Sequence, residues 1–206
     1  REITPGFFAW LVPLSVTRAH VGLLSRRQPK LYLKRLISSL MQQGKIVQAG
    51  GEIKCRRIPL RSLPKTHSNR LLVLGDAAGQ VKPTTGGGIY FGLLCAEMAA
   101  KNLHQALKNG DLGAESLAGY EREWRAMLGQ DIRLGSLARK FYERLSDRQI
   151  DGIFNITKKS GIVEDLLKEE NLTFDWHGRV VLSLARKKLL SKIGSVLKTP
   201  FRIGAE

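Results

Sequence analysis

The stretch LLVLGDAAGQVKPTTGGGIYFG, Leu71 to Gly92, decides the fold and points to a ligand. It opens with an apolar run, Leu71 to Leu74, which predicts a short buried strand. Gly75 to Gly79 follow directly, and a glycine-rich segment then leads into a helix predicted over Ile89 to Lys108 and ended by Asn109-Gly110. An ordinary core does not need so much glycine. The bare backbone therefore indicates close contact with a ligand, or else close packing of the helix on the strand.

Two groups in this stretch suit a cofactor. Asp76 stands at the carboxyl end of the predicted strand, where α/β proteins place ligand contacts, and its carboxylate can accept a hydrogen bond from a hydroxyl. Thr84 to Gly88 would offer N–H groups at the start of the helix, whose terminus carries about half a positive charge and suits an anion. A carboxylate beside such a terminus is the chemistry of a nucleotide or flavin site.

Two familiar nucleotide-binding motifs are absent from the chain. A phosphate loop needs Ser or Thr directly after its lysine, whereas Pro83 follows Lys82, so the sequence does not support a nucleoside triphosphatase. A G-x-G-x-x-G segment of the dinucleotide-binding type is also missing.

The charge of the chain calls for an anionic partner. The 206 residues are 43% apolar and 25% charged, which is enough for one large domain or two small ones, and the net charge is +16. Nucleic acid and an anionic lipid surface are both candidates, and a merely solvated basic face is the third possibility. Between Trp176 and Ala205 no acid occurs, and the basic residues are Arg179, Arg186, Lys187, Lys188, Lys192, Lys198 and Arg202.

Features that the sequence lacks indicate where the protein is located in the cell and whether its cysteines are reduced. No uncharged apolar window of about 18 residues and no export signal are found, so we expect a cytoplasmic protein or one bound to the inner membrane face. Cys55 and Cys95 lie far apart without metal-ligand spacing, which predicts two reduced thiols.

The remaining pattern predicts an α+β or α/β chain with strands first and helices last. We divide it into a strand-rich sheet over 1–60, the cofactor motif and its helix over 61–110, and a helical region over 111–206. An apolar stripe is expected on a helix after residue 111, at Tyr120, Trp124, Met127, Leu128 and Ile132. The other predicted elements are a hairpin of 6–14 with 18–24, a helix over 29–43 stopped by Gly44, a strand over 53–60, a polar loop over 61–69, and helices over 148–156, 162–169 and 178–197.

Two motifs together resemble a known family. Gly75-Asp76-Ala77-Ala78-Gly79 followed by Pro83-x-Thr85-Gly86-Gly87-Gly88-Ile89 is similar to the second flavin-contacting motif of FAD-dependent oxidoreductases with the para-hydroxybenzoate hydroxylase fold. Phe8-Ala9-Trp10-Leu11-Val12-Pro13, eight residues and Gly22-Leu23-Leu24 resemble the Y-x-W-x-F-P and G-x-G signature of the geranylgeranyl reductase family within that fold. Phe8, Val12 and Leu24 depart from the signature, which leaves the substrate open.

The resemblance implies a fold, a cofactor and a set of contacts. The chain would be the carboxyl-terminal part of such a flavoprotein, inactive alone, with the dinucleotide-binding segment before Arg1. Asp76 would accept a hydrogen bond from a ribityl hydroxyl of FAD, and the backbone of Gly86 to Ile89 would face the isoalloxazine ring, beside Pro83 and Thr84. Phe8, Trp10 and Pro13 would line a pocket for an isoprenoid chain, although plain core packing of Phe8 and Trp10 is the alternative. The full set of implied FAD contacts is Gly75, Asp76, Ala77, Pro83, Thr84, Gly86, Gly87, Gly88 and Ile89.

The implied reaction is hydride transfer from the flavin to a carbon–carbon double bond of a geranylgeranyl or related chain, with NAD(P)H or ferredoxin as electron donor. No proton donor is identified, since Tyr90 and Cys95 lie near the motif without a clear role and His20, His67, His104 and His177 show no metal spacing. An aromatic-ring monooxygenase of the same fold is the alternative. A basic nucleic-acid-binding module is the alternative from another class, but no nucleic-acid motif is found and no nucleic-acid partner is expected.

The basic tail generates a first prediction. Apolar residues recur at helical spacing between Gly178 and Lys198, which is typical of an interfacial helix. We expect the full-length protein to sediment with anionic but not zwitterionic vesicles at low salt, because each basic residue near an anionic surface contributes about 1 kcal/mol. Reversing Arg186, Lys187 and Lys188 to glutamate should abolish sedimentation and leave the flavin content unchanged. Equal binding to both vesicle types, or to neither, would contradict this role of the tail.

Overall fold

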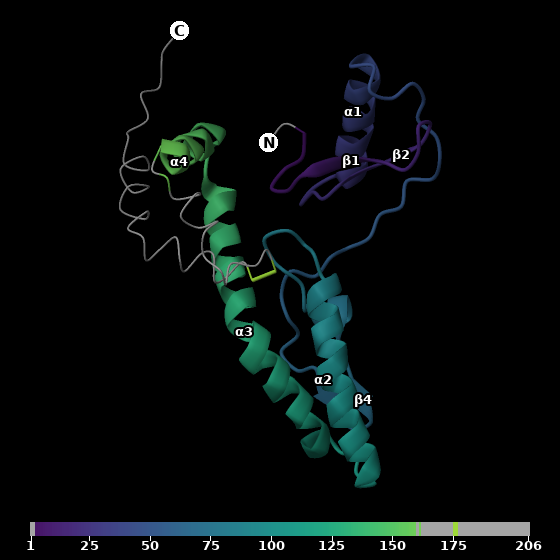
Figure 1. Cartoon of the computed structure of the whole chain (residues 1–206), viewed down its shortest axis with the longest axis vertical. Coiled ribbons are helices and arrows are strands. Elements are labelled where there is room, and N and C mark those ends of the chain that lie inside the picture. The colour runs from purple at the N-terminus through teal and green to yellow at the C-terminus, as the bar shows by residue number, and fades with distance from the viewer. Residues whose placement is uncertain (1–2, 160, 162–174, 177–206) are drawn as a thin grey trace. The chain divides into compact units, whose positions relative to one another are not determined.

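The structure is a computed structural model that describes residues 3–159, 161 and 175–176. The chain forms two compact units, Arg1–Arg57 and a second that begins at Ile58 (Figure 1). Within the described residues, no helix is both long enough and apolar enough to cross a membrane.

The first unit is a β-hairpin with one helix. Strands β1 (Ala9–Pro13) and β2 (Ala19–Leu23) pair antiparallel. The turn between them is closed by the N–H of Leu14, which donates to the Arg18 carbonyl over 2.8 Å. Helix α1 (Pro29–Gln42) follows and packs against β2. Its first residue is a proline, which the first turn of a helix tolerates. The hairpin and the helix therefore both form where the sequence predicts them.

The second unit is mostly helical. A short antiparallel pair, β3 (His67–Ser68) and β4 (Leu71–Leu72), leads into the 3₁₀ turn η1 (Gly75–Ala78). The helices are α2 (Ile89–Lys108), α3 (Ala114–Arg144) and α4 (Asp147–Lys159). The bounds of α2 agree with the sequence prediction, and the helix expected over 148–156 is confirmed as part of α4.

The core of this unit lies between α2 and α3. Side chains four residues apart on α3 meet those of α2, as expected where i and i+4 positions share one helix face. Met127 is the exception in the predicted stripe, because its side chain is 46% exposed. The buried residues are Phe91, Cys95, Met98 and Ala99 from α2 and Tyr120, Trp124, Leu128 and Ile132 from α3.

One strand prediction is wrong, a second is confirmed only in part, and two helix predictions cannot be compared. Residues 53–60 form no strand, because no neighbouring segment hydrogen-bonds to them. Only Leu71–Leu72 of the expected buried strand pairs, and Leu71 is 52% exposed, since its partner strand has just two residues. The helices predicted over 162–169 and 178–197, and with them the basic tail, lie outside the described residues.

A polar cluster joins the β3–β4 pair to α3. Glu121 accepts hydrogen bonds from the Thr66 N–H over 2.6 Å, from the Thr66 hydroxyl over 3.1 Å and from Arg125 Nε over 2.8 Å, and it pairs with His67 Nδ1 at 2.9 Å. The indole of Trp124 in turn donates to Thr66 Oγ1 over 2.9 Å. Burial alone would raise the pKa of Glu121, but these hydrogen bonds lower it from 4.5 to about 2.

This cluster predicts an acid-sensitive fold. Because the pKa of Glu121 is lower in the folded state, its contribution is complete above the unfolded value and is lost as the pH falls from about 5 to about 2. We expect Glu121→Gln to destabilise the chain by about 2 kcal/mol near neutral pH and to flatten the fall in stability over that acidic range. Urea unfolding at several pH values measures both effects.

The matched control is Glu115→Gln, an exposed acid on the same helix. It should leave stability and its pH dependence nearly unchanged. An equal loss in both variants would mean that the Thr66 cluster does not hold Glu121 as described.

Candidate cofactor site

Gly75, the first residue of the turn η1, and Gly79, which follows the turn, are glycines for different physical reasons. Gly75 has φ 63°, a conformation that other residues rarely adopt, and a Cβ there would meet nothing within 4 Å. Gly79 has φ 68°, and a Cβ would lie 2.2 Å from the Arg61 carbonyl oxygen. Close packing of backbone on backbone therefore explains Gly79, whereas Gly75 is explained by its conformation alone.

Gln80 holds this turn to α3. Its Oε1 accepts a hydrogen bond from the Gly75 N–H over 2.7 Å, and its Nε2 donates to the Tyr120 hydroxyl over 2.8 Å. The Tyr120 hydroxyl in turn donates a hydrogen bond to the Val73 carbonyl over 3.1 Å. Gln80 and Tyr120 are fully buried, and that burial raises the pKa of Tyr120 to about 12, so its hydroxyl stays protonated as a donor.

The loop after the turn closes on itself. The Lys82 N–H donates to the Gly87 carbonyl over 2.9 Å, and the Gly86 N–H donates back to the Lys82 carbonyl over 2.8 Å. Gly86 has φ 74°, which this reversal requires. As a result, the backbone at Gly87 faces solvent.

Helix α3 supports the loop from behind. Pro83 is buried against Gly135, where a Cβ would lie 3.2 Å from the Pro83 Cδ, so a larger residue would press on the loop. Arg139, which is only 7% exposed, donates from Nη1 to the carbonyls of Pro83 over 3.3 Å and Thr84 over 3.4 Å. Its Nε pairs with Glu143 at 2.9 Å, so the guanidinium is fixed from both sides.

Asp76 lies at the amino terminus of α2. The capping residue is Gly88, and a Cβ built on it would come within 2.3 Å of Asp76 Oδ1, so only glycine lets the carboxylate approach. No side chain caps this terminus. Within the described residues, no hydrogen bond or ion pair engages the Asp76 carboxylate either. Among the described residues, the site thus presents an unengaged carboxylate beside a helix terminus without a side-chain cap.

The structure brings the predicted FAD residues together at this terminus. Gly75, Asp76 and Ala77 form the turn, and Gly88 touches Asp76. Pro83 and Thr84 form the supported side of the loop, and Gly86 and Gly87 reverse it. Ile89 is 84% exposed and extends an apolar surface from the loop.

The predicted substrate residues lie in the first unit. Phe8 is 46% and Trp10 38% exposed, with ring centroids 5.9 Å apart, so core packing does not bury them there. Trp10 lies opposite Gly22 in the hairpin register, and a Cβ on Gly22 would be 2.4 Å from Trp10 Cζ2. The first glycine of the signature therefore makes room for its tryptophan. Pro13 ends β1 and is exposed.

Cys95 and Tyr90, the residues near the motif that were considered as proton donors, lie in different surroundings. Cys95 is fully buried in the α2–α3 core, and that burial raises its pKa to about 12, so it is not a proton donor at the surface. Tyr90 is 36% exposed and meets Trp176 edge-on at 6.3 Å. Lys82 Nζ lies 5.6 Å from the Tyr90 ring centroid and pairs with Asp175.

Metal binding finds no support in the described part of the chain. It contains no group of three or more His, Cys, Asp or Glu side chains that could hold a metal ion. His67 is engaged by Glu121, and His177 lies outside the described residues.

Sequence reasoning missed the supports of the site. Gln80, Gly135 and Arg139 were not predicted, because the contacts between the cofactor motif and α3 join residues 40 to 56 positions apart in the chain. The one local signal was a glutamine between Gly79 and Val81, a polar side chain in a stretch with little other side-chain bulk.

Several of the relatives found by comparison with known proteins carry the same name. No protein-family model matches the chain. The chain is 34% identical over 157 residues to the digeranylgeranylglycerophospholipid reductase of Methanocaldococcus jannaschii, covering 74% of this chain and 40% of the relative. It is 30% identical over 208 residues to the enzyme of that name from Methanosarcina acetivorans, covering 92% of this chain and 50% of the relative.

The fold has a solved counterpart as well. A geranylgeranyl bacteriochlorophyll reductase-like protein from Thermoplasma acidophilum aligns with a TM-score of 0.67 at 22% identity, over 95% of this chain and 49% of that chain. The chain spans about half the length of the curated relatives it matches. On this agreement of sequence and fold, the chain belongs to the geranylgeranyl reductase family, part of whose length it covers.

Proposed function

We propose that this chain forms part of an FAD-dependent reductase of carbon–carbon double bonds in geranylgeranyl or related isoprenoid lipids. The observation that carries the proposal is the unengaged Asp76 carboxylate beside the uncapped amino terminus of α2. A ligand that offers a hydroxyl to the one and an electron-rich ring edge to the other satisfies both groups, and the ribityl chain and isoalloxazine of FAD have these parts. The residues present therefore fit the cofactor.

The residues around the terminus have separate tasks in this proposal. Asp76 accepts the hydroxyl hydrogen bond, and the bare backbone of Gly87 and Gly88 lets a flat ring approach the helix. The helix terminus favours negative charge on the ring edge. Ile89, at 84% exposure, offers an apolar surface that a bound ring would remove from water. Gln80 and Arg139 hold the turn and the loop in place before anything binds.

The substrate class rests on the relatives and on the hairpin. Two relatives are named digeranylgeranylglycerophospholipid reductases, a name that gives a lipid with geranylgeranyl chains as what is reduced. FAD, when bound and reduced, supplies the hydride for such a reduction. Phe8, Trp10 and Pro13 offer the exposed apolar and aromatic surface that a prenyl chain requires, and Gly22 holds Trp10 against the hairpin. NAD(P)H or ferredoxin is the proposed source of electrons.

A substitution at Asp76 tests the cofactor site. In the full-length protein, Asp76→Ala should weaken FAD binding about 10- to 100-fold, because a hydrogen bond to a charged group contributes roughly 1.5 to 3 kcal/mol. Titration of the apoprotein with FAD, followed by flavin fluorescence, measures the affinity without any turnover. Asp151→Ala, an exposed acid on α4, is the control and should bind FAD as the unaltered protein does. Equal affinity in the two variants would remove Asp76 from the site.

Product analysis tests the reaction. We expect the full-length protein, chemically reduced and kept without oxygen, to add a pair of hydrogen atoms to each double bond of a geranylgeranyl lipid, as read by mass spectrometry. Trp10→Ala should lower turnover of the lipid and leave FAD affinity unchanged, because Trp10 belongs to the proposed substrate surface and not to the residues proposed to contact FAD. Oxygen-dependent gain of an oxygen atom by an aromatic substrate would instead show a monooxygenase and overturn the proposal.

A further inference from the structure

One exposed face of α3 alternates basic and apolar side chains. Its residues are four, three, one and three positions apart, so they lie on one side of the helix. All of them are exposed, with Leu137 at 56% and Phe141 at 43%. We name this surface the basic–apolar strip, and it consists of Arg133, Leu137, Lys140, Phe141 and Arg144.

The charge of the strip is not balanced by neighbouring acids. Within the described residues, no salt bridge engages Arg133, Lys140 or Arg144. Glu143, the acid next to Arg144 in the sequence, forms an ion pair with Arg139 Nε at 2.9 Å. The strip therefore presents cations to solvent with two large apolar side chains between them.

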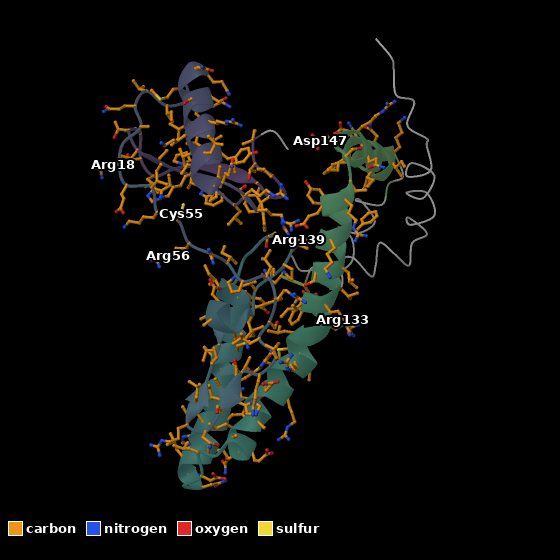
Figure 2. All side chains as sticks on the ribbon, turned by 180° about the vertical axis from the view of Figure 1, so that it is seen from behind. Arg18, Cys55, Arg56, Arg133, Arg139 and Asp147 are labelled. Atoms are coloured by element: carbon orange, nitrogen blue, oxygen red, sulfur yellow. The ribbon has the colours of Figure 1, made fainter. Side chains whose placement is uncertain are left out.

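The opposite side of α3 supports the cofactor loop. Gly135 packs against Pro83, and Arg139 binds the carbonyls of Pro83 and Thr84. Arg133 and Arg139 leave the helix on different sides (Figure 2). Because an α-helix with its side chains is about 10 Å across, whatever binds the strip lies about one helix diameter from the loop.

Helix α4 repeats the chemistry of the strip. None of its residues is buried, and Phe154 is 70% exposed. Lys158 and Lys159 are exposed in its last turn. A short amphipathic helix with no fully buried residue has the pattern of an interfacial helix.

We propose that the basic–apolar strip docks on an anionic lipid bilayer. Charge complementarity supports this occupant, since the strip carries three cations and no acid on a chain of net charge +16. Leu137 and Phe141 favour a bilayer over nucleic acid, because a phosphate backbone satisfies the cations but leaves these side chains in water. If the proposed function holds, docking brings the cofactor loop within reach of lipids that carry prenyl chains. The docking itself does not depend on it.

The test uses the full-length protein and two sets of vesicles, phosphatidylcholine alone and phosphatidylcholine with phosphatidylglycerol. Replacing Arg133, Lys140 and Arg144 together by glutamine should weaken binding to the anionic vesicles on the order of 100-fold at low salt, about fivefold for each charge. Leu137→Ser with Phe141→Ser should weaken it at least about 10-fold, and this loss should persist at high salt. Bound FAD is measured in each variant and should not change.

Matched controls keep the result specific to the strip. Leu107→Ser alters a leucine on another helix, α2, whose side chain is 58% exposed, nearly the same exposed fraction as that of Leu137. Lys34, Lys108 and Arg122, all exposed, provide a second triple glutamine variant with the same loss of charge. Both controls should lose little binding to the anionic vesicles.

Three results would overturn the proposal. The first is an equal loss in the strip and control variants, which would mean that only net charge matters. The second is binding that depends on Arg186, Lys187 and Lys188 but not on the strip. The third is unchanged vesicle binding with loss of affinity for a DNA duplex in the triple variant, which would assign the strip to nucleic acid.

Discussion

The hydrogen bonds of Gln80 are the constraint on which the second unit depends. A buried amide must satisfy its donors and its acceptor, and Gln80 does so by joining the Gly75 N–H to the Tyr120 hydroxyl. The turn η1 is thereby tied to the amino-terminal part of α3, where Tyr120 belongs to the same core as Trp124 and Leu128. Together with the packing of η1 on α2, this link fixes the position of Asp76 relative to that helix. A single side chain thus connects the packing of the core to the geometry of the candidate site.

The loop between the turn and α2 is likewise held by hydrogen bonds from a buried side chain of α3. Arg139 satisfies two carbonyls that would otherwise lose hydrogen bonds on burial, and Gly135 leaves room for Pro83. Both residues come from α3, so one long helix positions the turn and the loop together. The loop glycines can then stay bare toward solvent, because the rigidity of the site comes from its supports and not from its own side chains.

Elements with local signals were predictable from the sequence, and long-range contacts were not. The hairpin, α1 and α2 agree with their predictions because their signals are local: two apolar runs around a short polar turn for the hairpin, helical spacing for α1, and an Asn-Gly stop for α2. The strand expected over 53–60 failed because a strand needs a partner, and no local pattern reveals whether one exists. The predicted FAD residues do gather at one helix terminus, but the bonds of Gln80 to Tyr120 and of Arg139 to Pro83 could not be foreseen, since these partners lie 40 and 56 residues apart in the sequence.

The two cysteines differ in a way that has a practical consequence. Cys95 is enclosed in the α2–α3 core, whereas Cys55 is exposed close to the boundary between the two compact units. A thiol-reactive dye will therefore label Cys55 in the folded chain and reach Cys95 only after unfolding. The chain thus carries a built-in attachment point for a fluorophore, which can report on the arrangement of its two units while the residues around Asp76 stay unmodified.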